Sequence, residues 1–136
     1  MATAFKLSVV APDRAVAEVD AISAVVPGLE GYFGIMAGHE PIIAALRPGL
    51  LEFVSTENQR HFVAIGGGFA EVSSGKMTVL ADDAHMANEI DVAKMEAEIE
   101  EARKALRGEN STMTAADATL TIEKAVARIK AAKRAS

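Results

Sequence analysis

The sequence predicts an α+β fold, in which an N-terminal antiparallel β-sandwich is followed by a C-terminal antiparallel α-helical hairpin. Apolar and polar residues alternate from Phe5 to about Asp83, which is the period of half-buried strands. Turn-forming residues interrupt this part roughly every ten residues, a spacing typical of sandwiches and barrels. Beyond Asp83 the apolar residues recur every three or four positions, as on one face of a helix. We place the boundary between a sandwich domain, residues 1–86, and a helical domain, residues 87–136.

The composition fits one compact domain with a helical appendage. Of the 136 residues, 50% are hydrophobic and 24% are charged, which is the balance of a chain that buries a core. The net charge of −5 argues against a nucleic-acid-binding protein, which needs a surplus of Lys and Arg. The absence of cysteine excludes disulfides and thiolate metal sites. The sequence shows no signal peptide and no apolar run near the ~18 residues of a membrane span, so we expect membrane contact only through partners.

The sandwich strands are expected to be short. Phe5, Leu7 and Val9 alternate with polar residues, and similar pairs follow near residues 63–65 and 77–79. Turn residues divide the region at seven places: Pro12-Asp13, Pro27-Gly28, Gly38, Pro48-Gly49, Glu57-Asn58, Gly66-Gly67-Gly68 and Ser73-Ser74-Gly75.

Residues 31–43 are the most informative segment, because three glycines and a proline punctuate an apolar run. Glycine permits positive φ or close approach, whereas proline fixes φ and removes a donor. The segment therefore predicts a turn, a short strand and a second turn. It holds no catalytic set of residues, which favours a contact surface over an active site.

Two helices are expected in the C-terminal part, over residues 89–107 and 114–136. Gly108 suits the left-handed position in the turn at residues 107–111, and Asn88 and Thr114 stand at positions of N-terminal caps. Each helix carries one apolar stripe, and the two stripes are expected to face each other as a helix seam. The first stripe is Val92, Met95, Ile99, Ala102 and Leu106, and the second is Ala115, Ala118, Ile122, Ala125, Ile129 and Ala132.

The helix seam is expected to be weak. Residues 89–107 hold six acids and four bases, net −2, whereas residues 114–136 hold two acids and five bases, net +3. Exposed ion pairs are worth only ~0.2–1 kcal/mol each. The alanines bury little area, and area is worth ~25 cal/mol per Å². A seam of this kind can open.

Two groups of residues invite a catalytic or metal-binding interpretation. Residues 66–68 are glycines, but a phosphate loop needs Gly-Lys-Ser/Thr followed by a helix, so we favour a tight passage inside a strand. His39, His61 and His85 are spaced 22 and 24 residues apart, which fits no common zinc spacing. A hydrogen-bonded loop histidine is the better interpretation of His39.

Two charged groups leave alternatives open. Asp82 and Asp83 could form a carboxylate pair, but neighbours on a strand point to opposite faces, so a solvated strand end is favoured. The basic residues of the second helix either meet an acidic partner or stabilise the helix dipole, and the two interpretations have equal weight. These residues are Lys124, Arg128, Lys130, Lys133 and Arg134.

Five segments together resemble the epsilon subunit of the rotary F-type ATP synthase, which is called delta in mitochondria. They are Leu-Ser-Val-Val-Ala-Pro at 7–12, the loop at 31–41, Ala-Leu-Arg-Pro-Gly at 45–49, Gly-Gly-Phe-Ala-Glu-Val at 67–72 and Val-Leu-Ala-Asp at 79–82. The resemblance covers nearly the whole chain. It implies a ten-stranded sandwich and a helical hairpin in the central stalk, with no bond chemistry and no cofactor.

The resemblance also implies the partners of the chain. One sandwich face would pack against the gamma subunit, and a loop would face the ring of c subunits at positions matched by Glu30, Gly31, Tyr32 and His39. The hairpin would detach in a regulatory role and reach the catalytic alpha/beta hexamer, where it slows ATP hydrolysis. The location implied is the cytoplasmic face of a bacterial inner membrane, as a peripheral protein.

Some bacterial members of the family bind ATP through Ile/Leu-Asp-x-x-Arg-Ala. Here Ile90 and Asp91 are kept, but Lys94 and Met95 replace the arginine and the alanine. Lysine lacks the planar fork of arginine, so we expect weak or absent ATP binding. Two rivals to the rotor role are a nucleotide-sensing regulator and a free-standing β-sandwich that binds a ligand or acts as a metal-dependent enzyme.

Overall fold

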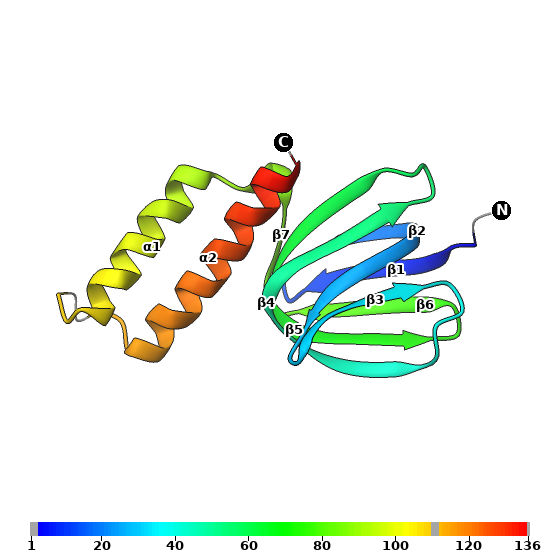
Figure 1. Ribbon diagram of the computed structural model, residues 1–136, viewed down its shortest axis with the longest axis horizontal. Coiled ribbons are helices and arrows are strands. Elements are labelled where there is room, and N and C mark those ends of the chain that lie inside the picture. The colour runs from blue at the N-terminus through cyan, green and yellow to red at the C-terminus, as the bar shows by residue number, and fades with distance from the viewer. Residues whose placement is uncertain (1–2, 110–111, 136) are drawn as a thin grey trace.

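Seven strands form a sandwich, and two helices lie to one side of it in the computed structural model, which describes residues 3–109 and 112–135 (Figure 1). The α+β fold expected from the sequence is confirmed. The strands are β1 (Phe5–Ala11), β2 (Arg14–Gly28), β3 (Gly31–Met36), β4 (Ile42–Ser55), β5 (Arg60–Ser73), β6 (Lys76–Ala81) and β7 (Ala84–Met86). A short 3₁₀ helix, η1 (Ala87–Glu89), leads to α1 (Val92–Leu106) and α2 (Ala115–Ala135).

The strands pair in the order β1-β6-β5-β4-β2-β3, and β1 also pairs with β2. Only the β1–β6 pair is parallel among the pairings of the described residues. The inward-facing residues of all the strands meet in one apolar core. Its largest fully buried members are Phe53, Leu7, Ile35, Leu51 and Ile65.

The prediction of short strands is wrong for β2, β4 and β5, which have 15, 14 and 14 residues. The turn residues expected to end these strands bend them instead. Pro48 still pairs with Gly66, and Gly68 pairs with Leu46 on one side and with Ala81 on the other. Because each long strand continues through its bend, the chain forms seven strands where the resemblance implied ten. The expected passage of the glycines through a strand is confirmed.

The segment at residues 31–43 begins directly with the short strand β3, because the first of the two predicted turns lies just before it, at residues 29–30. The second turn follows β3 at residues 37–38, as predicted. Gly31 and Gly38 adopt φ values of 139° and 84°, which are conformations that glycine permits.

Helix α2 lies between α1 and the sandwich (Figure 1). Helix α1 starts at Val92, three residues later than expected, because Asp91 rather than Asn88 is its N-cap. The Asp91 carboxylate accepts a hydrogen bond from the Lys94 backbone N–H at 3.2 Å. The cap expected at Thr114 is present, since its Oγ1 accepts from the Asp117 N–H at 3.1 Å. Gly108 has the expected positive φ, 77°.

The helix seam is present over part of its predicted length. Met95, Ile99 and Ala125 are buried together, and Ile122 and Ile129 pack against them. Ala102 and Ala118 are fully buried. At the ends of the stripes, Val92 and Ala132 are half-buried, whereas Leu106 is 47% exposed and Ala115 is also exposed. The sequence missed a second buried face on α2, where Ala127 and Ala131 pack against Leu50, Phe62 and Ala64 of the sandwich.

Candidate functional site

An apolar stripe crosses the outside of the sandwich at the half of β4 and β5 that lies away from the helices. Ile43, Phe69 and Leu80 are 72%, 57% and 56% exposed. Phe69 pairs with Ala45 on one side and with Leu80 on the other. Leu80 pairs in turn with Val10 of β1. We call Val10, Ile43, Ala45, Phe69 and Leu80 the apolar stripe. Large exposed apolar patches on a folded chain mark binding surfaces.

The sequence contains a signal for this stripe that the period-two pattern obscured. In β6, Met77 and Val79 point into the core, so Leu80 must point outward. In β5, Ala70 and Val72 point inward, so Phe69 points outward. An apolar residue at an outward position of an amphipathic strand is the observation that reveals the surface.

Three of the four residues expected to face the ring lie in the turn between β2 and β3 or directly after it. Glu30 is exposed, and Gly31 and Tyr32 begin β3. The Tyr32 Oη accepts a hydrogen bond from the Leu50 N–H at 3.1 Å. The Arg47 guanidinium lies 5.4 Å from the centre of the Tyr32 ring, and its Nε donates to the Gly28 carbonyl at 3.2 Å. These contacts from β4 hold the turn in one conformation.

His39 is not part of this turn. It follows the opposite end of β3, and six strand residues at about 3.3 Å each separate it from the turn. Its Nδ1 donates to the Glu40 carbonyl at 2.7 Å, as expected for a hydrogen-bonded loop histidine. The structure therefore does not bring Glu30, Gly31, Tyr32 and His39 into one loop.

A half-buried carboxylate joins the sandwich to α2. Asp83, in the bend between β6 and β7, lies 2.8 Å from the Lys124 Nζ and 3.2 Å from the Arg128 Nη2. Asp82 is exposed, so the two neighbouring carboxylates do not share a site. Neither earlier interpretation of Asp83 is correct: it forms no carboxylate pair, and it is not a solvated strand end. Two of the five basic residues of α2, Lys124 and Arg128, thus meet this one acid of their own chain.

Two further polar contacts lie at the same junction. The Arg14 Nη2 of β2 is 2.8 Å from the Glu89 Oε2 of η1 and donates to the Ala84 carbonyl at 3.1 Å. The Arg134 Nη2 is 3.3 Å from the Glu52 Oε1, and its guanidinium lies 5.3 Å from the centre of the Phe62 ring. The junction therefore combines ionic contacts with an apolar centre.

The pKa of Asp83 is set by its burial and by its two cationic partners. Burial raises the pKa, but the hydrogen bond from Lys124 and the charges of Lys124 and Arg128 lower it by more, so the net pKa lies below its ordinary value of 3.8. A lowered pKa means that the contact stabilises the docked hairpin at every pH above about 3.8. The stabilisation is lost as the pH falls through the folded-state pKa.

We therefore expect docking to be unchanged from neutral pH down to about pH 4 and to weaken as the pH falls further. NMR shifts of the Ala127 and Ala131 methyl groups report contact with the sandwich, and those of Ala102 and Ala118 report the helix seam. Loss of the Ala127 and Ala131 shifts already at pH 6, or docking that strengthens as the pH falls below about 4, would contradict this result. Far-UV circular dichroism separates detachment from unfolding.

The residues considered for phosphate or metal binding do not assemble into such a site. Gly66, Gly67 and Gly68 lie inside β5. The His61 ring stacks on Phe53, with the ring centres 5.0 Å apart. Across residues 3–109 and 112–135, no group of three or more His, Cys, Asp or Glu side chains is placed to hold a metal ion.

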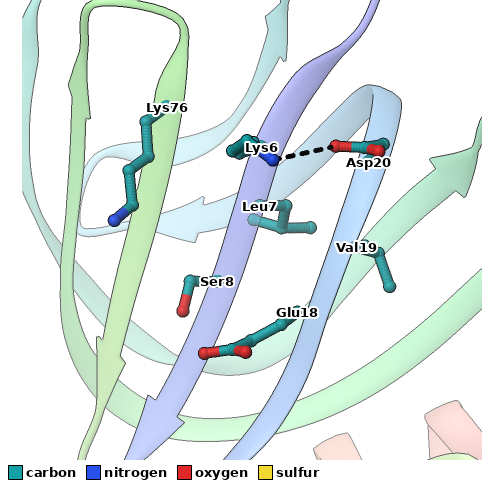
Figure 2. A pocket seen from close by; sticks show the side chains of 7 residues that line it. All are labelled: Lys6, Leu7, Ser8, Glu18, Val19, Asp20 and Lys76. Carbon is teal, nitrogen blue, oxygen red and sulfur yellow. Dashed lines mark ion pairs between the residues drawn. The ribbon is translucent and has the colours of Figure 1, made fainter.

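The hollow in Figure 2, about 360 Å³, lies over β1 and β2. Its charges are mixed, with Lys6 and Lys76 beside Glu18 and Asp20, and the Lys6 Nζ is 3.9 Å from the Asp20 Oδ1. Both residues of this pair are largely exposed to solvent.

Comparison with known proteins places the chain in a family. The family model described as ATP synthase, Delta/Epsilon chain, beta-sandwich domain, matches residues 4–87. The ATP synthase epsilon chain of Moorella thermoacetica is 35% identical over 93% of this chain and 94% of its own length. That of Syntrophomonas wolfei is 37% identical over 96% of this chain and 95% of its own length. The chain belongs to the ATP synthase delta/epsilon family.

Solved structures agree with this assignment to the epsilon family. A chain of the Euglena gracilis mitochondrial ATP synthase, in a structure of OSCP, F1 and the c-ring, matches 97% of this chain and 81% of its own length, with a TM-score of 0.73 and 25% identity. A chain of the Tetrahymena thermophila mitochondrial enzyme matches 96% of this chain and 94% of its own length, with a TM-score of 0.56 and 15% identity, which supports the fold alone. Within the described residues, no helix is both long and apolar enough to cross a membrane.

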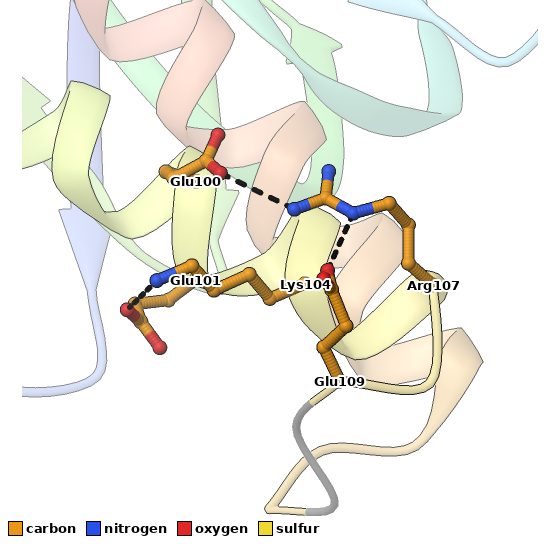
Figure 3. Close-up of polar contacts among 5 residues, drawn as sticks. All are labelled: Glu100, Glu101, Lys104, Arg107 and Glu109. Atoms are coloured by element: carbon orange, nitrogen blue, oxygen red, sulfur yellow. Dashed lines mark hydrogen bonds and ion pairs between the residues drawn. The ribbon is translucent and has the colours of Figure 1, made fainter.

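The far end of the hairpin is held by charged contacts within α1 and between α1 and the turn that follows it (Figure 3). Arg107 contacts Glu100 at 3.3 Å and Glu109 at 2.6 Å, and Lys104 contacts Glu101 at 3.4 Å. These side chains are about half exposed, so each contact contributes little to stability. The hairpin end is shaped locally and does not depend on the sandwich.

The remnant of the family's ATP motif has structural roles here. The Asp91 carboxylate caps α1, and Ile90 packs against both the helix seam and the apolar centre of the junction. The Lys94 side chain is exposed.

We expect ATP to bind this epsilon chain weakly or not at all, because the capping carboxylate is occupied and Lys94 cannot offer a bidentate fork. Isothermal titration calorimetry with MgATP on the isolated chain is the measurement. Lys94→Arg combined with Met95→Ala restores the motif and is the matched variant. Micromolar affinity of the unaltered chain would contradict the expectation.

Proposed function

We propose that this epsilon-family chain is a rotor subunit in the central stalk of a bacterial proton-translocating F-type ATP synthase. It joins the gamma subunit to the c-ring and performs no bond chemistry. The observation that carries the proposal is the apolar stripe, because a rigid sheet that exposes a row of large apolar side chains is suited to bind another protein.

The gamma subunit is proposed to cover the apolar stripe. A cluster of exposed apolar side chains backed by a rigid sheet can be desolvated at low entropic cost. His39 comes four residues before Ile43, so we assign His39 to this side of the molecule. The c-ring is proposed to contact the turn formed by Glu30, Gly31 and Tyr32, which Arg47 and Leu50 hold in place.

The two domains proposed from the sequence, residues 1–86 and 87–136, would have separate tasks. The sandwich would hold the rotor together, while the hairpin would leave the sandwich and contact the alpha/beta hexamer as a brake on ATP hydrolysis. The ionic junction supports this role, because such contacts exchange readily with water and with other charged surfaces. The chain would sit at the cytoplasmic face of the inner membrane as a peripheral protein.

Reconstitution tests the proposal. A synthase depleted of its epsilon subunit should regain coupled ATP synthesis when the purified chain is added, and the chain alone should turn over no substrate. Mass spectrometry of a ligand or metal retained by the isolated chain, together with turnover, would support the rival enzyme instead. Failure to join the depleted synthase would refute the rotor role.

Removal of the hairpin tests the brake. A chain of residues 1–86 keeps all seven strands, including β7, so it should assemble and support coupled synthesis. We expect ATP hydrolysis by the synthase to rise several-fold, because the segment that would enter the hexamer is gone. Unchanged hydrolysis would leave the hairpin without a braking role, while the rotor assignment would stand on the coupling result.

A further inference from the structure

Contact between the helices and the sandwich is made by α2 and combines one apolar cluster with ionic contacts. The buried apolar residues at the junction are Leu50, Phe62 and Ala64 on the strands and Ala127 and Ala131 on α2. The alanines of α2 contribute only methyl groups, but they cover the larger side chains of Leu50 and Phe62. Docking therefore depends on this apolar cluster and on the ionic contacts around it.

Asp83 is the best-formed of these ionic contacts. Its Oδ2 binds Lys124 and its Oδ1 binds Arg128, so each oxygen takes one cation. Lys124 and Arg128 are four residues apart and thus lie on one face of α2. The three side chains are 19–28% exposed, whereas the surface pair Glu101–Lys104 is about half exposed. Contacts shielded to this degree are stronger than surface pairs, and salt screens them less than surface pairs but still weakens them.

Gly66 makes room for this carboxylate. The Gly66 N–H donates to the Asp83 carbonyl at 2.9 Å, which places the two residues side by side. A Cβ at Gly66 would overlap the Asp83 Oδ2 and lie 2.6 Å from its Cγ and Oδ1. The φ of Gly66 is not among the positive values of its neighbours Gly67 and Gly68. Alanine at position 66 therefore displaces a side chain without straining the strand.

We propose that Gly66, Asp83, Lys124 and Arg128 form an electrostatic latch that sets whether the hairpin is docked on the sandwich or released. Gly66 is a positioning residue, because it acts only through the place it leaves for Asp83. The latch opens as ionic strength rises, since salt screens both ion pairs. The latch rests on contacts within one chain, whereas its effect on ATP hydrolysis rests on the function proposed above.

The test uses the full-length chain, which contains no cysteine, so two labels can be placed without ambiguity. Ser73→Cys at the end of β5 and Ala97→Cys on α1 are exposed positions for a donor and an acceptor dye. Single-molecule energy transfer then reports the released-to-docked ratio as sodium chloride is raised from low to high concentration.

Gly66→Ala and Asp83→Asn are each expected to raise the released-to-docked ratio at low salt about tenfold, between the effects of exposed and buried ion pairs. Both should flatten the salt dependence. Lys124→Gln with Arg128→Gln should do the same from the α2 side, where the fold of the sandwich is untouched. Asp82→Asn is the matched control and should leave ratio and salt response unchanged, because Asp82 is exposed.

Distances and salt response equal to the parent in all three latch variants would overturn the latch. A change in Asp82→Asn as large as that in Asp83→Asn would also overturn it, since a general charge effect would then explain both. If the latch variants release the hairpin but the reconstituted synthase hydrolyses ATP at the parent rate, the latch stands and the braking role fails.

Discussion

Gly68→Ala should prevent the sandwich from folding or lower its melting temperature by about 15 °C. Gly68 has φ 139°, and a Cβ there would overlap the Leu80 carbonyl oxygen and lie 2.9 Å from the Ala81 Cα. Both neighbours are backbone atoms of β6, so no side chain can move aside. Strained φ and overpacking together cost roughly 4 kcal/mol, and a domain of this size loses about 4 °C per kcal/mol.

Gly75→Ala is the matched control for this substitution. Gly75 also has a positive φ, 77°, but nothing lies within 4 Å of the added Cβ. The free energy of unfolding should fall by about 1 kcal/mol, which is the backbone conformational cost alone. Equal melting temperatures for the two variants, measured by circular dichroism, would show that close approach of β5 to β6 does not determine the effect.

Phe69→Glu combined with Leu80→Glu should weaken binding to an epsilon-depleted synthase by about 100-fold or more. Each parent side chain contributes about 1.5–3 kcal/mol when it is fully buried, and each new carboxylate would be desolvated at the interface. Both side chains are more than half exposed in the free chain, so its stability should change by less than about 0.5 kcal/mol per site.

Leu120→Glu is the control for the charge change, because Leu120 is 41% exposed on α2, away from the stripe. It should bind as the parent does in a titration of labelled chain against the depleted complex. Parent-like affinity of the Phe69→Glu, Leu80→Glu double variant would remove the apolar stripe as the gamma-binding surface while leaving the family assignment intact.

Local sequence patterns predicted the type of each element well, because strand and helix periods depend on neighbours along the chain. These patterns failed where contacts between residues distant in the sequence determine the structure. Proline and glycine at residues 48 and 66 look like strand ends, yet pairing between β4 and β5 continues through them. The cap of α1 was misplaced since Asn88 and Asp91 both carry an oxygen acceptor, and only the path of the chain selects Asp91.

The candidate surfaces were predictable to different degrees. The turn at residues 30–32 stood out by composition, whereas the separation of His39 from it depends on the length of β3. The second face of α2 was missed because alanine recurs on several faces of this helix, also at positions 116, 118, 125 and 132, so the alanines at 127 and 131 did not stand out as a separate face. The two partners of Asp83, Lys124 and Arg128, lie more than 40 positions further along the chain, and no local sequence pattern connects them with Asp83.

The last turn of α2 rests on the sandwich, with Arg134 against Glu52 and Phe62, while the amino end of the chain emerges on the far side (Figure 1). A fluorescent protein or affinity handle fused beyond α2 would press against this contact and bias the hairpin toward detachment. The same fusion before β1 would point away from the helices. Two versions of the same polypeptide tagged at opposite ends would therefore differ in apparent activity.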